Sequence, residues 1–350
     1  MELLDFLNEV STNYVLLITS ILTLLVILIN GWTDAPNAIA TCVATKSISA
    51  KKAVLMAAIF NLLGILFMSL INTAVAQTIY NMVNFGADTQ SALIALCAAM
   101  VGILIWAILA WAFGIPTSES HALIAGISGA AIAINGSIAG INGAEWMKVI
   151  YGLILSTVIG FGAGFGFVKL IEVICRKMDR RKTTRFFRKG QIASGAAMAF
   201  VHGAQDGQKF MGVFLLGVTL AGGTVVPAGT AISVPIWLMV LCAVVMGLGT
   251  SIGGYKIIKT VGIDMVKLEE YQGFATDISA AGCILFSTLT GLPVSTTHVK
   301  SMSIMGVGFA KNPNRVRWDI VKEMALTWIL TFPGCGLIGF LMAKLFMLIF

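Results

Sequence analysis

Apolar stretches about as long as a membrane-spanning helix recur from one end of this 350-residue chain to the other. Hydrophobic residues make up 58% of the sequence and charged residues only 11%, whereas a soluble globular protein has roughly 25% charged residues. We therefore expect an all-α, multi-pass protein of the cell membrane, embedded in the lipid bilayer along its whole length. Residues 1–13 contain acidic but no basic side chains, so the start of the chain is not expected to be a secretory signal.

Basic residues are distributed very unevenly between the predicted loops. Eight of the 23 lie between Arg176 and Lys189, whereas the stretches 77–90, 136–145 and 221–232 contain no Lys or Arg. Positive charge marks the cytoplasmic side of a membrane protein, so this pattern predicts that both termini lie outside, and it argues against nucleic acid as a partner. About ten transmembrane segments are predicted, at 14–44, 52–76, 91–113, 116–135, 146–173, 191–220, 233–255, 272–291, 293–310 and 321–348.

Two of these segments are too long for a single simple span and carry polar interruptions. The first contains Asn-Gly-Trp-Thr-Asp-Ala-Pro-Asn at 30–37, and the second contains His-Gly-Ala-Gln-Asp-Gly-Gln-Lys at 202–209. Glycine, proline and carboxylates at such places predict broken helices near the middle of the membrane.

The interruptions match each other, and so does a second pair of motifs. Gly-Ile-Pro-Thr-Ser-Glu-Ser-His at 114–121 is similar to Gly-Leu-Pro-Val-Ser-Thr-Thr-His at 291–298. Both pairs are separated by about half the chain, which predicts two copies of one unit: a repeat at 1–175, a basic cytoplasmic linker at 176–190 and a second repeat at 191–350. Five segments per copy make the repeats inverted, an organisation typical of secondary transporters with a site at the midplane.

The second motif pair predicts an anion site. Pro116 and Pro293 stand where a helix would begin, and hydroxyl residues follow them. The free N–H groups and the positive dipole end of a helix N-terminus bind anions without a cationic side chain. Inverted repeats would bring both helix starts together, and such donors suit a tetrahedral oxyanion.

Asp34 and Asp206 are carboxylates within predicted spans, which makes them candidates for function. They would repel a bound anion, so cations or protons must accompany it and the two acids become the coupling device. Lys209 is expected to pair with Asp206 or to attract the anion, and extension of its side chain to a membrane surface is an equal alternative. Further candidates for a supporting role are Glu119, Asp277, His121 and His298. A proton-handling role is considered for His202 as well, because all three histidines of the chain lie in the motifs.

At these four motifs the sequence resembles the inorganic phosphate transporter (PiT) family, in its bacterial low-affinity phosphate permease form. The resemblance implies a secondary active symporter that imports inorganic phosphate. It implies phosphate-binding residues at Thr117, Ser118, Ser295, Thr296 and Thr297. It also implies cation-coupling residues at Asp34, Asn37 and Asp206, with Thr33 and Gln205 directly before the two acids.

The co-transported ion is expected to be a proton, because Lys209 stands at the position that matches Asn37 and a fixed ammonium disfavours sodium there. Sodium coupling stays open, with Asp34, Asn37 and Asp206 as the sodium ligands in that case. The cargo is either free phosphate or a metal–phosphate complex, and a sulfate permease of the same family is a further alternative. An anion channel is the competing class outside the family. We expect no enzymatic activity and no cofactor, and a homodimer is left open.

Overall fold

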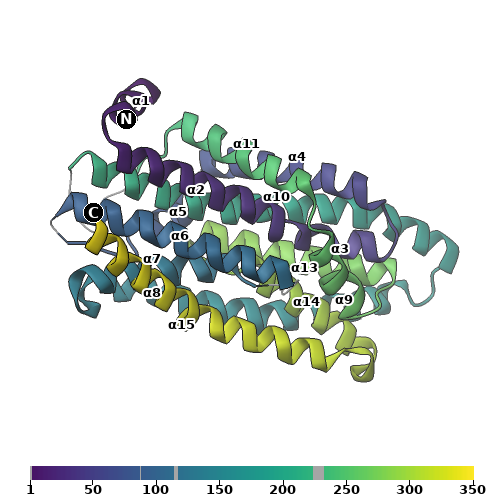
Figure 1. Cartoon of the computed structure of the whole chain (residues 1–350). Helices are drawn as coiled ribbons and strands as arrows, with labels where there is room; N and C mark the ends of the chain where they lie inside the picture. Colours follow the sequence, from purple (N-terminus) through teal and green to yellow (C-terminus); the bar gives the residue numbers. More distant parts are fainter. Residues whose placement is uncertain (1, 87, 114–116, 224–231) are drawn as a thin grey trace.

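The computed structural model describes residues 2–86, 88–113, 117–223 and 232–350, and nearly all of them are helical. Within these ranges, β structure is limited to one isolated bridge between Val83 and Ile141. The long helices run roughly along one direction and form a bundle (Figure 1). In chain order the α-helices are α1 (Leu3–Thr12), α2 (Tyr14–Thr33), α3 (Pro36–Ala44), α4 (Ala50–Ile71), α5 (Ala74–Tyr80), α6 (Thr89–Phe113), α7 (Glu119–Asn135), α8 (Gly143–Ile154), α9 (Gly160–Cys175), α10 (Arg180–Ala221), α11 (Ile236–Ile252), α12 (Tyr255–Ile257), α13 (Glu270–Leu289), α14 (Thr296–Lys311) and α15 (Trp318–Ile349).

The structure supports a multi-pass membrane protein. Judged over the described residues, five helical segments are long and apolar enough to cross a membrane, namely Tyr14–Ala44, Ala50–Ile71, Thr89–Phe113, Gly143–Cys175 and Trp318–Ile349. A sixth results if α11 and Tyr255–Asp264, bent by 63°, form one broken span. α7 and α14 have 17 and 16 residues, fewer than the ~20 of a full span. Each predicted span contains a helix, while the count of ten stays a prediction.

The break predicted in the first long segment is present. α2 ends at Thr33, α3 begins at Pro36, and Asp34 and Ala35 connect the two helices. Proline lacks an N–H group and cannot continue the hydrogen-bond ladder of a preceding helix, although it fits well at a helix start. Pro36 is thus the local cause of the break that places Asp34 between two helix ends.

The break predicted in the second long segment is wrong. α10 runs without interruption for 42 residues from Arg180 to Ala221, through Gly203 and Asp206, and its first turns take up most of the predicted 176–190 linker. The 202–209 motif contains glycines but no proline, and a glycine costs a helix only ~1 kcal/mol. Gly203 has a packing reason instead, because a Cβ there would lie 2.3 Å from the backbone oxygen of Asn61 on α4.

The packing of the helices follows a paired pattern. α7 packs against α15 as α14 packs against α9, and α4 packs against α10 as α11 packs against α2. α6 contacts α2, α7 and α15, whereas α13 contacts α10, α14 and α9. The helices of the first half correspond in order to those of the second: α2, α4, α6, α7 and α9 to α10, α11, α13, α14 and α15. When each helix is replaced by its counterpart, every contact named above becomes another contact that is also present.

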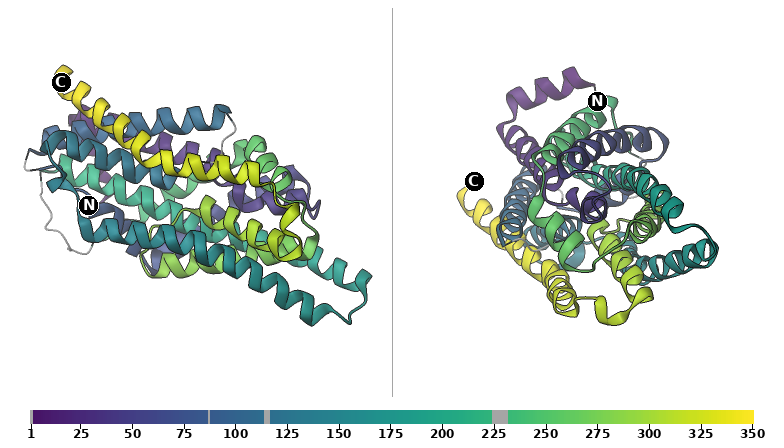
Figure 2. Two further views of the ribbon diagram at one scale, coloured as in Figure 1. Left: turned by 90° about the horizontal axis from the view of Figure 1, so that it is seen from below. Right: turned by 90° about the vertical axis from the view of Figure 1, so that its right-hand side faces the viewer.

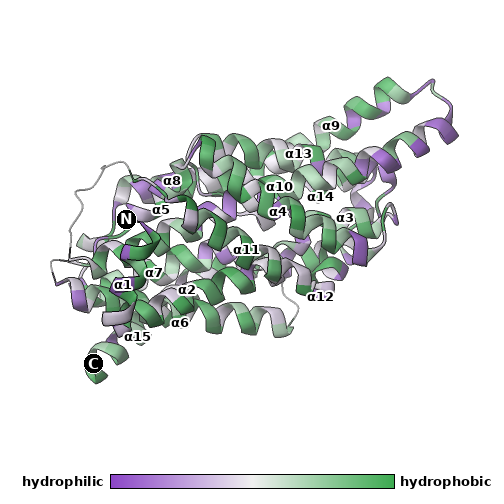
Figure 3. Cartoon of the chain, turned by 90° about the horizontal axis from the view of Figure 1, so that it is seen from above, coloured by the Kyte–Doolittle hydropathy of each residue, from purple (hydrophilic) through white to green (hydrophobic). Residues whose placement is uncertain are grey.

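The two ends of the bundle differ in character. The N- and C-termini lie at the same end, whereas the turn between α9 and α10 extends from the opposite end (Figures 1 and 2). That turn and the start of α10 are hydrophilic, whereas most of the bundle between the two ends is apolar (Figure 3). Large hydrophobic side chains such as Leu109, Phe286 and Ile329 are exposed on the outside of the bundle, as a lipid-facing surface requires.

Candidate functional site

The break between α2 and α3 buries Asp34 inside the bundle, where only 2% of its surface is exposed. Its Oδ1 atom accepts hydrogen bonds from Asn37 Nδ2 at 2.7 Å and from the Thr297 hydroxyl on α14. Asn37 Nδ2 also lies 3.0 Å from Thr297 Oγ1. The Asp34 Oδ2 and Asn37 Oδ1 atoms have no hydrogen-bond partner among the described residues. The site therefore keeps acceptors that are available for a donor or a cation.

Asp206 lies in the middle of α10 and is completely buried. Its Oδ1 atom is 2.6 Å from the Lys209 ammonium, and its Oδ2 atom accepts from the Thr296 hydroxyl at 3.2 Å. His202 Nε2, one helical turn earlier, lies 3.3 Å from the same Oδ2 atom. Thr296 bonds to Asp206 and Thr297 bonds to Asp34, so both carboxylates contact the first turn of α14.

Asp34 and Asp206 lie in one cluster. One ligand atom each from Asp34, His202 and Asp206 lie within 4.8 Å of one another, and all three side chains are buried. Two carboxylate oxygens and an imidazole nitrogen form a donor set that can hold a cation. The expectation that the two acids share one buried location is fulfilled.

Two helix N-termini meet beside this cluster. Ser118 caps α7 by accepting from the His121 N–H at 3.2 Å, and Ser295 caps α14 by accepting from the His298 N–H at 3.2 Å. The rings of His121 and His298 contact each other edge to face, with centroids 4.6 Å apart. The first turns of the two motif helices are therefore in contact.

The helix starts differ slightly from the sequence expectation. α14 begins at Thr296 with Ser295 as its N-cap, so Pro293 precedes the first turn and does not begin the helix. Pro116 lies outside the described residues. In both motifs a serine hydroxyl accepts a hydrogen bond from one N–H group of the first turn.

The residues predicted to bind phosphate lie at the starts of α7 and α14, where they make different contacts. Ser118 and Ser295 use their hydroxyl oxygens as caps, and Thr296 and Thr297 donate to the two carboxylates. Thr117 directly precedes the Ser118 cap and is partly exposed. Their roles as phosphate ligands stay a prediction.

Two predicted residues lie away from the carboxylate cluster. Gln205 donates to the Leu292 carbonyl at 2.9 Å and accepts from Thr288 at 2.5 Å, so its amide joins α10 to α13. Asp277 forms a buried ion pair with Lys300. Both side chains have structural partners of their own, and the cation-coupling role expected for Gln205 stays a prediction.

Other predicted supporting residues do adjoin the cluster. Glu119 opens α7 and accepts from the hydroxyl of Thr33, directly before Asp34, while its Oε2 atom has no partner within the described ranges. The ring of His121 stacks on that of Phe332, with ring centroids 4.5 Å apart, and the ring centroids of His298 and Trp328 are 3.8 Å apart. The two histidines thus join the helix starts to α15.

Two polar residues with buried contacts were not among the predicted ones. Ser120 contacts Asp206 at the site, and Lys300 pairs with Asp277 farther away. His202, a candidate for proton handling, contacts Asp206 because residues four apart share one face of an uninterrupted helix. The Lys300–Asp277 pair has no local sequence signal.

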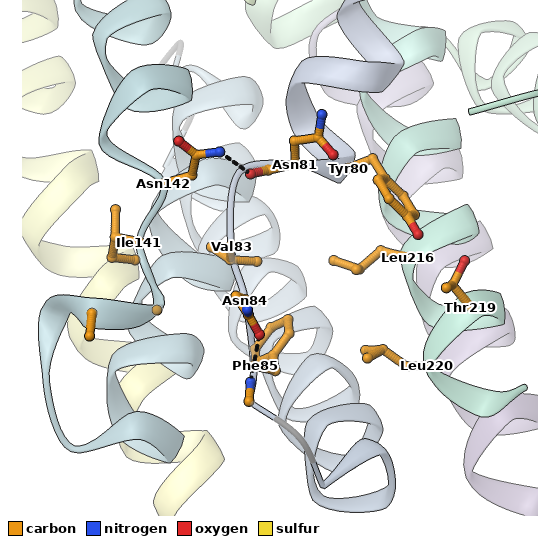
Figure 4. Close-up of a pocket in the computed structure, with 13 residues that line it drawn as sticks. Tyr80, Asn81, Val83, Asn84, Phe85, Ile141, Asn142, Leu216, Thr219 and Leu220 are labelled. Carbon is orange, nitrogen blue, oxygen red and sulfur yellow. Dashed lines mark hydrogen bonds between the residues drawn. The ribbon is translucent and has the colours of Figure 1, made fainter. Parts of the chain in front are cut away.

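The site is closed in this structure. Asp206, Lys209, Thr296 and Thr297 have no exposed surface. A separate cavity of about 320 Å³ lies at the end of the bundle, between the 81–86 and 139–142 segments and α10 (Figure 4). Its lining residue Leu216 is seven positions beyond Lys209, about 10 Å along the helix, so protein separates this cavity from the buried carboxylates.

Comparison with known proteins gives one consistent result. Residues 30–339 match the model of the phosphate transporter family. A probable low-affinity inorganic phosphate transporter of Bacillus subtilis is 38% identical over 326 residues, 91% of this chain and 95% of that protein. A protein of the same description from Mycobacterium leprae is 38% identical, over 93% of this chain and 77% of the relative.

A solved structure shares the fold. This protein, described as the sodium-dependent phosphate transporter, superposes with a TM-score of 0.87 at 23% identity, over 97% of this chain and 100% of that one. The match confirms the all-α membrane architecture, and the family and its relatives are transporters, not enzymes. From the match over residues 30–339 and the two relatives that align with more than nine tenths of it, we conclude that this chain belongs to the phosphate transporter family.

Proposed function

We propose that this protein is a secondary active symporter that imports inorganic phosphate together with protons. The observation that supports this most directly is the burial of Asp34 and Asp206 in one cluster beside two helix N-termini. The N–H groups and dipoles of helix starts favour an anion, whereas the two carboxylates oppose it. Such a site binds its anion well only when positive charge arrives with it.

The electrostatic repulsion between phosphate and the two carboxylates is large, so phosphate binding depends strongly on the positive charge that is transported with it. A phosphate dianion and one carboxylate ~6 Å apart repel by about 5–6 kcal/mol at an effective dielectric constant of 20. Entry into a negative cell interior adds ~2.3 kcal/mol per elementary charge for each 100 mV. Neutralising positive charge removes both penalties, which is the physical basis of symport here.

Lys209 and Asp34 favour protons over sodium as the mobile partner. Lys209 already supplies a fixed positive charge to Asp206. Asp34 keeps its unpaired Oδ2 atom, where a proton can bind without the coordination shell that a metal ion needs. Sodium coupling is the alternative, with Asp34, Asn37 and Asp206 as ligands.

Unpaired acceptors favour phosphate over sulfate. Asp34 Oδ2, Asn37 Oδ1 and Glu119 Oε2 are buried oxygens without donors among the described residues. Hydrogen phosphate carries an O–H group that can donate to such an oxygen, whereas sulfate at neutral pH carries none. A site built to hydrogen-bond an O–H group discriminates strongly against a ligand that lacks it.

We further propose that the chain consists of two inverted repeats, 1–175 and 191–350, with both termini outside. The paired packing of α2, α4, α6, α7 and α9 with their counterparts supports the repeat. The position of both termini at the end opposite the basic α9–α10 turn supports the orientation (Figures 1 and 3).

Uptake of labelled phosphate into proteoliposomes tests the function, with the proton and sodium gradients imposed separately. An inward proton gradient with equal sodium on both sides should drive accumulation, and a sodium gradient at equal pH should not. Uptake that requires sodium and ignores the pH step would overturn proton coupling. Protein-free liposomes are the control, and absence of uptake under either gradient would contradict phosphate symport.

Two further arms of this experiment identify the cargo. Excess unlabelled sulfate should leave phosphate uptake unchanged, and strong competition would favour the sulfate alternative. Removal of divalent metal separates free phosphate from a metal–phosphate complex, for which the Asp34–His202–Asp206 cluster offers suitable ligands.

A further inference from the structure

Lys209 is a buried lysine with a complete set of hydrogen-bond partners. Its ammonium lies 2.5 Å from Ser120 Oγ, 2.6 Å from Asp206 Oδ1 and 2.6 Å from the Val294 carbonyl oxygen. The side chain has no exposed surface. An ammonium group has three N–H donors, so each donor is matched by one oxygen.

Lys209 therefore has no free N–H group with which to bind a phosphate. A lysine that binds an anion directly must keep at least one N–H group for it, and here all three are used within the protein. The partners are instead a carboxylate, a hydroxyl and a backbone carbonyl, which are the oxygen ligands that surround a hard cation in proteins.

The first half of the chain has no such charge at the matching place. Asn37 stands three residues after Asp34 as Lys209 stands three residues after Asp206. Its neutral amide donates to Asp34 Oδ1 at 2.7 Å, and Asp34 Oδ2 stays unpaired. The two carboxylates therefore differ: one is already neutralised by a covalently attached cation, and the other is not.

We propose that Lys209 is a tethered cation that permanently fills the cation position of the second half, so that a mobile cation binds only at Asp34. The role of Lys209 as a selectivity residue rests on the proposed phosphate–cation symport. The ammonium prevents sodium from entering the Asp206 position and lowers by one the number of mobile positive charges that each phosphate requires.

Removing the ammonium and offering small cations in its place tests this. Lys209→Ala leaves a cavity lined by Asp206, Ser120 and the Val294 carbonyl. Equilibrium exchange of labelled phosphate across proteoliposomes needs no gradient, so it can be compared at one pH in choline, sodium, potassium, ammonium or methylammonium media. In choline, exchange by Lys209→Ala should fall by roughly a hundredfold, on the scale expected when one partner of a buried pair is lost. Ammonium, methylammonium or sodium should restore at least a tenth of wild-type exchange.

Matched variants separate this role from a general loss of structure. Lys148→Ala removes a half-exposed lysine that pairs with Glu145, and its exchange should equal wild type in every medium. The double variant Lys209→Ala/Asp206→Asn no longer carries the charge that needs a cation, so its exchange should not respond to the medium.

Thermal unfolding of the purified protein provides a measurement that does not depend on transport. Sodium or ammonium should raise the unfolding temperature of Lys209→Ala relative to choline and leave that of the wild type unchanged. The inference is overturned if Lys209→Ala exchanges phosphate normally in choline, or if no small cation restores either its exchange or its stability. Absence of phosphate exchange by the wild type would instead refute the proposed function, while the unfolding comparison would still test the cation position.

Discussion

Lys300 on α14 forms an ion pair with Asp277 on α13, and neither side chain has any exposed surface. The Thr41 hydroxyl on α3 donates to Asp277 Oδ1 at 2.6 Å and lies 3.1 Å from the Lys300 ammonium. Ser194 on α10 donates to Asp277 Oδ2 at 3.2 Å. The pair therefore holds four helices together two turns beyond the break at Asp34.

Asp277→Asn should strongly destabilise the protein, because it leaves the Lys300 ammonium buried without its counter-charge. Removing one partner of such a pair costs about 3–5 kcal/mol. The double variant Asp277→Leu/Lys300→Met should lose less stability than Asp277→Asn alone, since apolar side chains of similar size can replace a buried pair. Thermal unfolding in detergent measures both effects.

The Lys311–Glu269 pair provides the control, because its side chains are 34% and 48% exposed. Glu269→Gln should change stability by no more than ~1 kcal/mol, as exposed ion pairs do. Equal unfolding temperatures for Asp277→Asn and the wild type would show that the buried pair does not hold the helices.

Thr297→Val should impair phosphate uptake, because it removes the hydroxyl that donates to Asp34 and accepts from Asn37. Thr297→Ser keeps that hydroxyl and should retain most activity. Losing one hydrogen bond to a charged group costs about 1.5–3 kcal/mol, which corresponds to a ten- to hundredfold loss of uptake rate. Thr290→Val is the matched control, since the exposed Thr290 hydroxyl bonds, within the described part of the chain, only to the backbone of its own helix. Equal uptake by Thr297→Val and Thr297→Ser would rule out a role for this hydroxyl.

Ser118→Ala and Ser295→Ala should each raise the phosphate concentration that gives half-maximal uptake. Each substitution removes the N-cap of a motif helix, at a cost of about 1 kcal/mol, or roughly fivefold in affinity. Concentration series with labelled phosphate measure the effect. Ser137→Ala removes a cap from the exposed turn at 138–140 and should leave uptake unchanged. Wild-type values in both motif variants would exclude the two helix starts as the anion site.

Local chemistry explains which features could be predicted from the sequence. Pro36 dictates a helix start, so the break beside Asp34 was predictable. The matched motifs predicted that both acids and both helix starts would meet, and the His121–His298 contact confirms the meeting of the helix starts. These inferences needed only backbone rules and the repeat.

The second half shows where this reasoning fails. Because α10 continues through the motif, successive residues turn by about 100° around the helix. Gln205 therefore points away from its neighbour Asp206 and toward Thr288, whereas His202 and Lys209 return to the face of Asp206. The Lys300–Asp277 pair depends on how α13 and α14 pack, and no local sequence pattern predicts that packing.

Gly203→Ala tests the packing explanation for the continuous helix. A Cβ at position 203 would lie 2.3 Å from the Asn61 backbone oxygen, so α4 and α10 would have to separate. We expect a marked fall in the unfolding temperature and loss of phosphate uptake, because His202 and Asp206 lie on the helix that would move. Gly282→Ala is the matched control, since a Cβ there meets no described atom within 4 Å. That change should be neutral or should stabilise α13 by up to ~1 kcal/mol through helix propensity. If Gly203→Ala stabilises the protein as Gly282→Ala does, the glycine is not required by the close approach of α4, and a hinge in α10 becomes the better explanation.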